Sequence, residues 1–121
     1  MNVLVTGASG FVGRAVVARL LAGGHRVRAA VRRPIALADA QVHVVGDIAG
    51  PTSWAPALAD IDAVVHLAAR VHRAHDTLAE LRRVNRDGTA RLARSCRPGT
   101  RFVLMSSIRA VVDESHPTAI D

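Results

Sequence analysis

The chain has 121 residues, of which half are hydrophobic, with a single cysteine and a formal net charge of +6. This length suffices for one domain with one core, and the core has to be aliphatic because the chain contains only two Phe, one Trp and no Tyr. One cysteine excludes an internal disulfide framework. The apolar runs are too short for a membrane span or a signal peptide, so the composition predicts a soluble, cytoplasmic protein.

All sixteen basic residues are arginines, spread from Arg14 to Arg109. Aromatic side chains that could stack on bases do not alternate with them, so a solvated arginine-rich surface is favoured over a nucleic-acid interface.

Residues 2–13 read Asn-Val-Leu-Val-Thr-Gly-Ala-Ser-Gly-Phe-Val-Gly. An apolar run without alternation predicts a buried parallel strand, and the three glycines that follow predict a turn into a helix. Gly7 suits the turn, Gly10 lets a ligand approach the backbone, and Gly13 lets the helix pack against the strand. The N–H groups of this turn and of Phe11 and Val12 would then face a diphosphate at the positive end of the helix.

A second predicted strand over residues 26–31 completes a βαβ unit, which favours a dinucleotide site over a glycine-rich turn that binds nothing. The segment Thr-Gly-Ala-Ser-Gly-Phe-Val-Gly also resembles the opening of the extended short-chain dehydrogenase/reductase family, the NAD(P)-dependent epimerases and dehydratases. The resemblance runs along nearly the whole chain but covers only the first part of a typical family member.

The helix over residues 11–22 carries Val12, Val16 and Leu20 at i, i+4 spacing and ends at Gly23-Gly24. The second strand ends at Arg32-Arg33, where an NAD-specific fold usually has an acidic residue. Two guanidinium groups suit the 2′-phosphate of NADP, which favours NADP over NAD, although both side chains could also simply face solvent.

A short loop leads to a strand over residues 41–45, followed by Asp47 and Ile48. The resemblance implies that Asp47 binds the adenine amino group and Ile48 packs on the ring; an Asp at a turn is otherwise a local cap. A short helix is expected over residues 51–59, capped by Thr52 or Ser53.

A strand over residues 63–67 precedes His66-Leu67-Ala68-Ala69, which resembles the family's H-x-A-A segment. The resemblance implies that Leu67, Ala68 and Ala69 bind the cofactor, because the small side chains of this segment let the ribose lie against the strand end. His66, His72 and His75 lack the spacing of a zinc site and no cysteine is near, so no metal is expected.

An amphipathic helix is predicted over residues 76–97, with Leu78, Leu81, Asn85, Gly88 and Leu92 on one face. Asn85, the polar member of this face, is expected to bond the backbone of neighbouring strand ends and is predicted as one of the cofactor-binding residues. Asn-x-x-Gly-Thr resembles the family's motif in this helix, and the resemblance implies a homodimer through it; the alternative is a solvated arginine face.

The last predicted strand, over residues 101–105, leads to Ser107. In the family this position orients the substrate beside a Tyr-x-x-x-Lys pair, whereas a strand-end hydroxyl can also be satisfied by backbone alone. The chain has no Tyr and no Lys, so the proton-transfer group of the family is missing from these 121 residues.

Right-handed crossovers and the glycine turn together predict a truncated, Rossmann-type, doubly wound α/β fold: three layers and a parallel sheet in strand order 3-2-1-4-5 over residues 1–121. Three functions stay open. The chain is the NAD(P)-binding portion of a nucleotide-sugar epimerase or dehydratase or of a carbonyl reductase, a non-catalytic NAD(P)-sensing module, or a basic domain that binds nucleic acid. The intact glycine spacing argues against the third.

Overall fold

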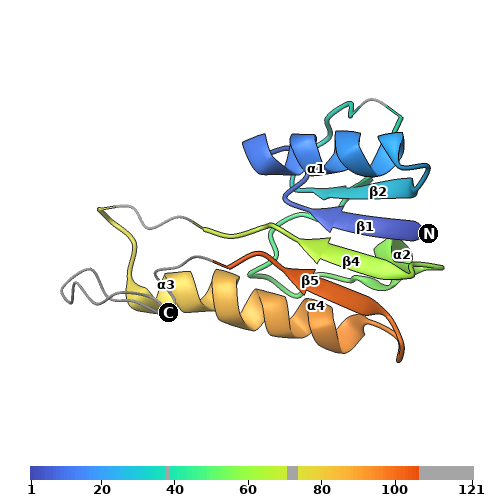
Figure 1. Ribbon diagram of the computed structural model, residues 1–121. Helices are drawn as coiled ribbons and strands as arrows, with labels where there is room; N and C mark the ends of the chain where they lie inside the picture. Colours follow the sequence, from blue (N-terminus) through green and yellow to red (C-terminus); the bar gives the residue numbers. More distant parts are fainter. Residues whose placement is uncertain (38, 71–73, 107–121) are drawn as a thin grey trace, which may run out of the picture.

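Five parallel strands form one sheet in the computed structural model, which describes residues 1–37, 39–70 and 74–106 (Figure 1). In chain order the strands are β1 (Asn2–Thr6), β2 (Arg26–Val31), β3 (Gln41–Val44), β4 (Ala63–His66) and β5 (Arg101–Leu104). Their order across the sheet is β3-β2-β1-β4-β5. The predicted order and the predicted parallel pairing are both confirmed.

Helix α1 (Phe11–Ala22) covers one face of the sheet. It buries Val17 against Val3, Val5 and Val27 of β1 and β2. Of the expected apolar stripe, Val12 is 42% exposed, because the first turn of α1 projects beyond the strands. Val16 and Leu20 pack at the edge of this core.

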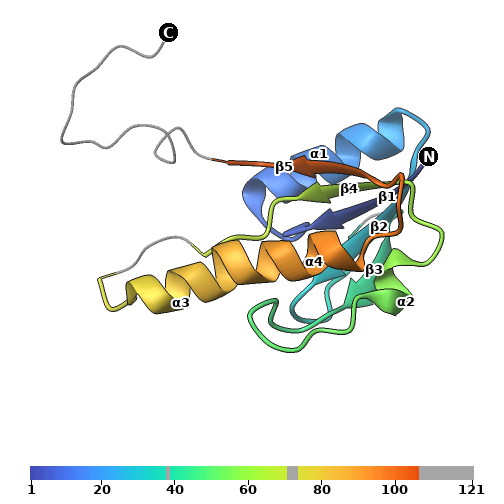
Figure 2. The same ribbon diagram turned by 90° about the horizontal axis from the view of Figure 1, so that it is seen from below.

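The opposite face is covered by α2 (Ala55–Leu58) and by a long helix, as Figure 2 shows. The long helix consists of α3 (Leu78–Arg82), a π-helical turn η1 (Arg83–Gly88) and α4 (Thr89–Ser95). Leu4, Val64, Trp54, Ile61 and Leu92 form the core on this side. Helices on both faces of a parallel sheet make the predicted three layers.

The long helix begins with a capping box rather than at Asp76. The Thr77 hydroxyl accepts a hydrogen bond from the Glu80 N–H at 3.2 Å, and the Glu80 carboxylate accepts one from the Thr77 N–H at 2.9 Å. These bonds hold the pKa of Glu80 below its usual range. Contrary to the predicted apolar face, Leu78 is 61% exposed because α3 extends past the end of the sheet.

The helix predicted over residues 51–59 is much shorter than expected. Only Ala55–Leu58 is helical, Trp54 stands at the N-cap, and no side chain caps it. The Thr52 hydroxyl, one of the two predicted caps, instead donates to the carbonyl of Asp47 at 2.8 Å. Thr52 therefore closes the loop after β3 rather than starting a helix.

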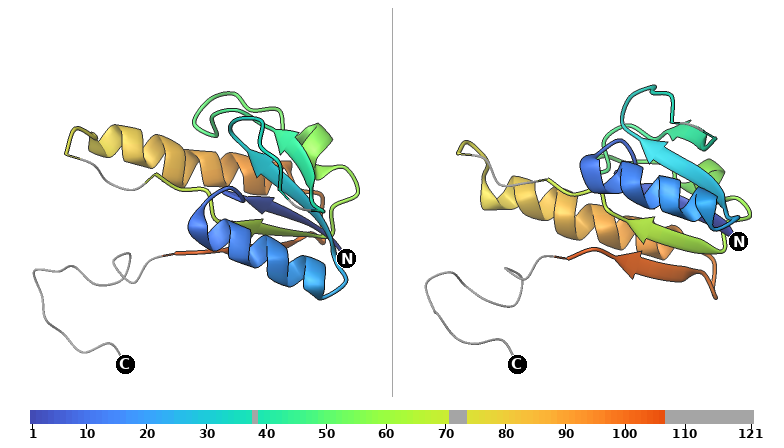
Figure 3. Two further views of the ribbon diagram at one scale, coloured as in Figure 1. Left: turned by 90° about the horizontal axis from the view of Figure 1, so that it is seen from above. Right: turned by 45° about the horizontal axis from the view of Figure 1, so that its top comes forward.

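From β1 the chain runs through β2 to β3 on one side and then returns to β4 and β5 on the other side of β1, so the direction of strand addition reverses between β1 and β4. At this switch point the loops after the carboxyl ends of β1 and β4 diverge, as both views in Figure 3 show. Ligands of doubly wound sheets bind at such a point. Among the helices of the described residues, none is long and apolar enough to cross a membrane.

Candidate functional site

A cleft of about 480 Å³ lies at the carboxyl ends of the strands, at the switch point. This volume falls in the usual range for small-molecule sites. Eight residues predicted for the cofactor line it: Gly7, Gly10, Arg32, Asp47, Ile48, Leu67, Ala68 and Ala69. Five other predicted residues lie outside the lining that the described residues make: Phe11, Val12, Gly13, Arg33 and Asn85.

The three glycines of the turn have different structural roles. Gly7 has φ +65°, and a Cβ there would meet the Ala68 nitrogen at 2.8 Å. A Cβ on Gly13 would meet the Gly7 carbonyl oxygen at 2.0 Å, so the helix packs on the turn itself. On Gly10 a Cβ would touch only the Gly7 oxygen, at 3.4 Å. The fold therefore requires Gly7 and Gly13, whereas nothing in the described structure requires Gly10.

The first turn of α1 offers no anionic side chain to its own N–H groups. Gly10 stands at the N-cap and offers no side chain, and the first turn has no acidic residue. The Phe11 side chain is 95% exposed, so it contributes nothing to the core. The first N–H groups of a helix lack intrahelical partners and carry partial positive charge, which suits an anionic ligand beside Gly10.

The two arginines after β2 differ in position. Both are exposed, but only Arg32 lines the cleft. The neighbouring residues Ala30 and Val31 form the apolar floor next to it. A guanidinium on the rim can reach a phosphate in the cleft by charge-assisted hydrogen bonds.

The loop after β3 carries Asp47 and Ile48. One Asp47 carboxylate oxygen, Oδ1, accepts from the Ala49 N–H at 2.9 Å, which is the local cap considered from the sequence. Asp47 also lines the cleft, while Ile48 is buried and lines the cleft with its exposed edge. The Arg91 guanidinium of α4 donates to the carbonyls of Ile48 and Gly50 and so fixes this loop.

The segment from Leu67 to Arg70, which we call the cleft wall, extends β4 past its last sheet residue. Leu67 and Ala68 donate their N–H groups to the Thr6 hydroxyl, each at 3.2 Å. At the other end the Arg70 N–H donates to Asn85 Oδ1 at 2.8 Å, and Asn85 Nδ2 donates to the Arg70 carbonyl at 3.0 Å. Asn85 thus bonds a strand-end backbone as expected, although it is exposed rather than buried.

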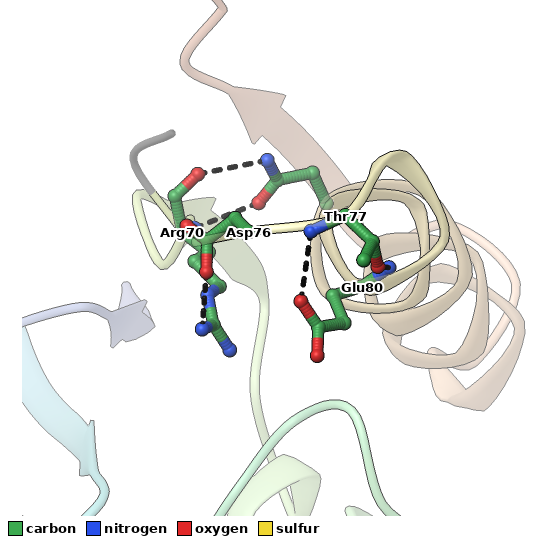
Figure 4. A network of polar contacts seen from close by, with 5 residues as sticks. Arg70, Asp76, Thr77 and Glu80 are labelled. Atoms are coloured by element: carbon green, nitrogen blue, oxygen red, sulfur yellow. Dashed lines mark hydrogen bonds and ion pairs between the residues drawn. The ribbon is translucent and has the colours of Figure 1, made fainter. Parts of the chain in front are cut away.

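Arg70 is also held by its side chain. Its guanidinium bonds the Asp76 carboxylate at 2.5 Å, beside the Thr77–Glu80 capping box (Figure 4). The Asp76 side chain is only 3% exposed, and this contact raises the pKa of Arg70. The cation at the end of the cleft wall is therefore fixed in place.

Sequence reasoning missed several lining residues, above all Thr6, Trp54 and Arg70. Thr6 directly precedes Gly7 and is the register partner of His66 in the pairing of β1 with β4. This pairing places Thr6 beside the predicted segment after β4 and could have identified it as a site residue. Trp54 is 2% exposed, and its indole N–H has no partner among the described atoms. Ser107, the predicted substrate-orienting residue, and His72 lie outside the described residues.

The profile of the NAD dependent epimerase/dehydratase family matches residues 3–120. A UDP-glucose 4-epimerase of Vibrio cholerae is 37% identical over 115 residues, covering 89% of this chain and 35% of that protein. A ceramide reductase of Caulobacter vibrioides is 37% identical over 113 residues, with the same two coverages.

Among solved structures, MoeE5 in complex with UDP-glucose and NAD superposes with a TM-score of 0.75 at 33% identity. The match covers 89% of this chain and 37% of MoeE5. This chain therefore spans about a third of the length of the proteins it resembles.

Proposed function

The chain belongs to the NAD-dependent epimerase/dehydratase family, and we propose that it is the dinucleotide-binding portion of an oxidoreductase that acts on a nucleotide sugar. The observation that carries the proposal is Gly10: it borders the cleft, and no neighbour in the described structure forbids a side chain there. A glycine that the fold does not require is explained by a ligand that approaches its backbone.

The residues present fit such a cofactor. Gly7, Gly10 and the uncapped N-terminus of α1 would hold the diphosphate, and the loop of Asp47 and Ile48 would hold the adenine. Leu67, Ala68 and Ala69 would lie along the ribose next to the nicotinamide. When bound, the nicotinamide supplies a hydride acceptor or donor that no amino-acid side chain can replace.

The rim of the cleft supports NADP as the preferred dinucleotide, with NAD as the alternative. Arg32 and Arg33 follow β2, and no acidic residue stands between Val31 and Asp39. An acidic side chain would repel the 2′-phosphate of NADP, whereas guanidinium groups bind phosphate well.

A pair of leucine substitutions at the two ends of α1 tests dinucleotide binding. Gly10→Leu should abolish binding of NADPH and NADH, measured by calorimetric titration, and leave the melting temperature almost unchanged. Gly23→Leu is the matched control: Gly23 caps the opposite end of α1, and a Cβ there would meet the flexible His25 side chain at 3.3 Å. It should bind like the parent chain. Undiminished binding by Gly10→Leu contradicts the proposed site.

A carbonyl reductase is the second candidate, because the ceramide reductase is as similar to this chain as the epimerase is. The two reactions differ in whether the dinucleotide is consumed. An epimerase returns the hydride to its substrate, whereas a reductase oxidises one NADPH for each carbonyl reduced. Stoichiometric NADPH oxidation with a carbonyl substrate, by a longer protein that contains this chain together with a proton-transfer residue, would favour the reductase.

On the ground of the family resemblance alone, we propose that a second copy of the chain docks on the outer face of the long helix. Arg82, Arg83 and Arg94 are exposed on this helix. Two such faces repel each other at low ionic strength, and salt screens the repulsion. Sedimentation velocity should therefore show more dimer in 0.5 M salt than in a low-salt buffer, and a monomer at all salt concentrations would refute the dimer.

A further inference from the structure

One chain of hydrogen bonds clamps the cleft wall at both of its ends. Thr6 holds the near end through the N–H groups of Leu67 and Ala68, and the Asn85 side chain holds the far end through the backbone of Arg70. The two holding residues come from different elements, since Thr6 ends β1 and Asn85 lies in the π-helical turn η1.

His66 connects these two ends. Its Nδ1 lies 2.6 Å from the Thr6 hydroxyl, and its Nε2 lies 2.9 Å from the Thr89 hydroxyl. The Thr89 hydroxyl in turn donates to the Asn85 carbonyl at 2.7 Å. The imidazole is 1% exposed, and the Phe102 ring covers it with a centroid separation of 6.0 Å.

The contacts determine where each proton lies. A hydroxyl has one proton and two lone pairs. Thr6 already accepts from two N–H groups, so its proton goes to His66 Nδ1. The Thr89 hydroxyl donates its proton to the Asn85 carbonyl, so toward His66 the hydroxyl oxygen can only accept a hydrogen bond, from a proton on Nε2. The imidazole is therefore neutral, with its proton on Nε2. Burial, which lowers the pKa of His66, acts in the same direction.

We propose that His66 is a positioning residue that links Thr6 to Thr89 and Asn85 and thereby holds the cleft wall in the shape that receives the dinucleotide. Its effect on binding rests on the function proposed above, whereas the link itself does not. The imidazole touches no ligand in this role. It sets the spacing between the end of β1 and η1, and the wall from Leu67 to Arg70 spans that spacing.

The test compares two substitutions at Thr89. Thr89→Val keeps the branched shape but removes both the acceptor for Nε2–H and the donor to Asn85. NADPH affinity should fall about tenfold, because one broken link leaves a buried group unpaired. Thr89→Ser retains the hydroxyl and should restore the parent affinity. Val17→Ala is the stability control: it destabilises the core under α1, on the other face of the sheet. It should leave affinity unchanged at temperatures where the chain is folded.

Nitrogen-15 NMR of the histidine rings gives an independent readout. In the parent chain at pH 7, His66 should show an unprotonated Nδ1 and a protonated Nε2, and Thr89→Val should speed hydrogen exchange of the Arg70 amide. A proton on Nδ1, or unchanged Arg70 exchange in Thr89→Val, would overturn the link. If the parent chain binds no dinucleotide, the proposed function fails, and these NMR results still decide the link.

Discussion

Arg32 and Arg33 are adjacent in the sequence, yet only Arg32 borders the cleft. We predict that the chain binds NADPH more tightly than NADH and that Arg32→Ala removes most of this preference. A hydrogen bond to a charged group contributes roughly 1.5–3 kcal/mol, so the ratio of the two dissociation constants should fall by about tenfold or more. Parallel calorimetric titrations with both cofactors measure the ratio.

Arg33→Ala serves as the matched substitution one residue away. It removes the same charge from the same loop and should reduce the preference by less than Arg32→Ala does. Equal affinities for NADPH and NADH in the parent chain would refute the preference for NADP, and an equal loss in both variants would refute the distinction between the two arginines.

The buried imidazole of His66 makes stability depend on pH. Among the described residues, the side chains that hydrogen-bond the imidazole or face its ring, Thr6, Thr89 and Phe102, carry no charge, and burial holds its pKa below the ordinary value of about 6.5. The unfolded chain then binds the proton more readily than the folded chain does. The contribution of His66 to the free energy of unfolding is complete above pH 6.5 and is lost as the pH falls toward the lowered value.

We therefore predict that the melting temperature falls as the pH is lowered from 7 to 5 and that His66→Gln makes this decline shallower. His43→Gln, a half-buried histidine of β3, is the control and should keep the parent slope. A slope that His66→Gln leaves unchanged would show that other groups cause the decline.

At the level of elements, the junction of turn and helix depends on Gly13. Alanine has the higher helix propensity, by about 1 kcal/mol. Its Cβ would nevertheless lie 2.0 Å from the Gly7 carbonyl oxygen, which is backbone and cannot move aside cheaply. We predict that Gly13→Ala lowers the free energy of unfolding by about 2 kcal/mol or more, measured by urea denaturation.

The same substitution at the other end of α1 provides the comparison. Gly23→Ala would meet a flexible side chain and two carbonyl oxygens at 3.3–3.5 Å, so it should change stability by less than 1 kcal/mol. A Gly13→Ala variant as stable as Gly23→Ala would mean that the helix shifts away from the turn, so that the two are not closely packed.

The strands and α1 could be predicted because their signals are local. Apolar runs such as Val3–Val5 and the glycine spacing determine both the element and the side of the sheet on which it lies. The short α2 could not, since the choice of Thr52 between capping a helix and bonding Asp47 depends on the fold of the loop. The π-helical turn could not be predicted either. A π-helical turn adds one residue to an α-helix, and this addition changes the apolar periodicity of the sequence too little to be recognised.

The residues of the candidate site could likewise be predicted only where they lie in a sequence motif. The glycine turn, Arg32, Asp47 and the segment after β4 were found from motifs, and they line one cleft. Trp54 and Arg70 belong to no motif and reach the cleft through packing and an ion pair. Thr6 opens the glycine motif but was not predicted for the site; its contact with the cleft wall depends on the register of β1 and β4. Asn85 was assigned to the cofactor but lies outside the lining, where it holds the cleft wall.

At the level of the whole molecule, the sheet is covered unevenly. Val5 is completely buried beneath α1, its neighbour Val65 on β4 is half-buried, and Val103 on β5 is 55% exposed. Leu104 and Met105 are exposed to a similar extent. The well-covered part of the sheet is thus β1 and β2, whereas β3 is an open edge like β5, with Val44 53% exposed. The adenosine diphosphate half of a dinucleotide would bind at the glycine turn and at the loops after β2 and β3.

This asymmetry leads to a prediction for the isolated 121-residue chain. Because the residues proposed to hold the diphosphate and adenine all line one cleft of this chain, ADP should compete for the site almost as well as NADPH does. Competition titrations measure the two affinities. An NADPH affinity more than about a hundredfold above that of ADP would show that this chain also holds the nicotinamide half firmly, since that ratio corresponds to roughly 2.7 kcal/mol.

The same chain should be catalytically silent toward UDP-glucose and toward carbonyl substrates, even where it binds the dinucleotide. Hydride transfer at a carbon that bears a hydroxyl needs a group that takes or gives the proton, and such a group typically contributes 10² to 10⁴ in rate. No Tyr and no Lys occur among the 121 residues. A serine such as Ser107 can orient an oxygen, but a hydroxyl of ordinary acidity does not accept its proton. Two readouts are needed, with the parent chain and Gly10→Leu purified side by side. Chromatography detects an epimerised nucleotide sugar, which forms without net change in the dinucleotide, and absorbance follows NADPH formation or oxidation with the other substrates. Turnover by the parent chain that is absent from Gly10→Leu would mean that another residue of this chain transfers the proton.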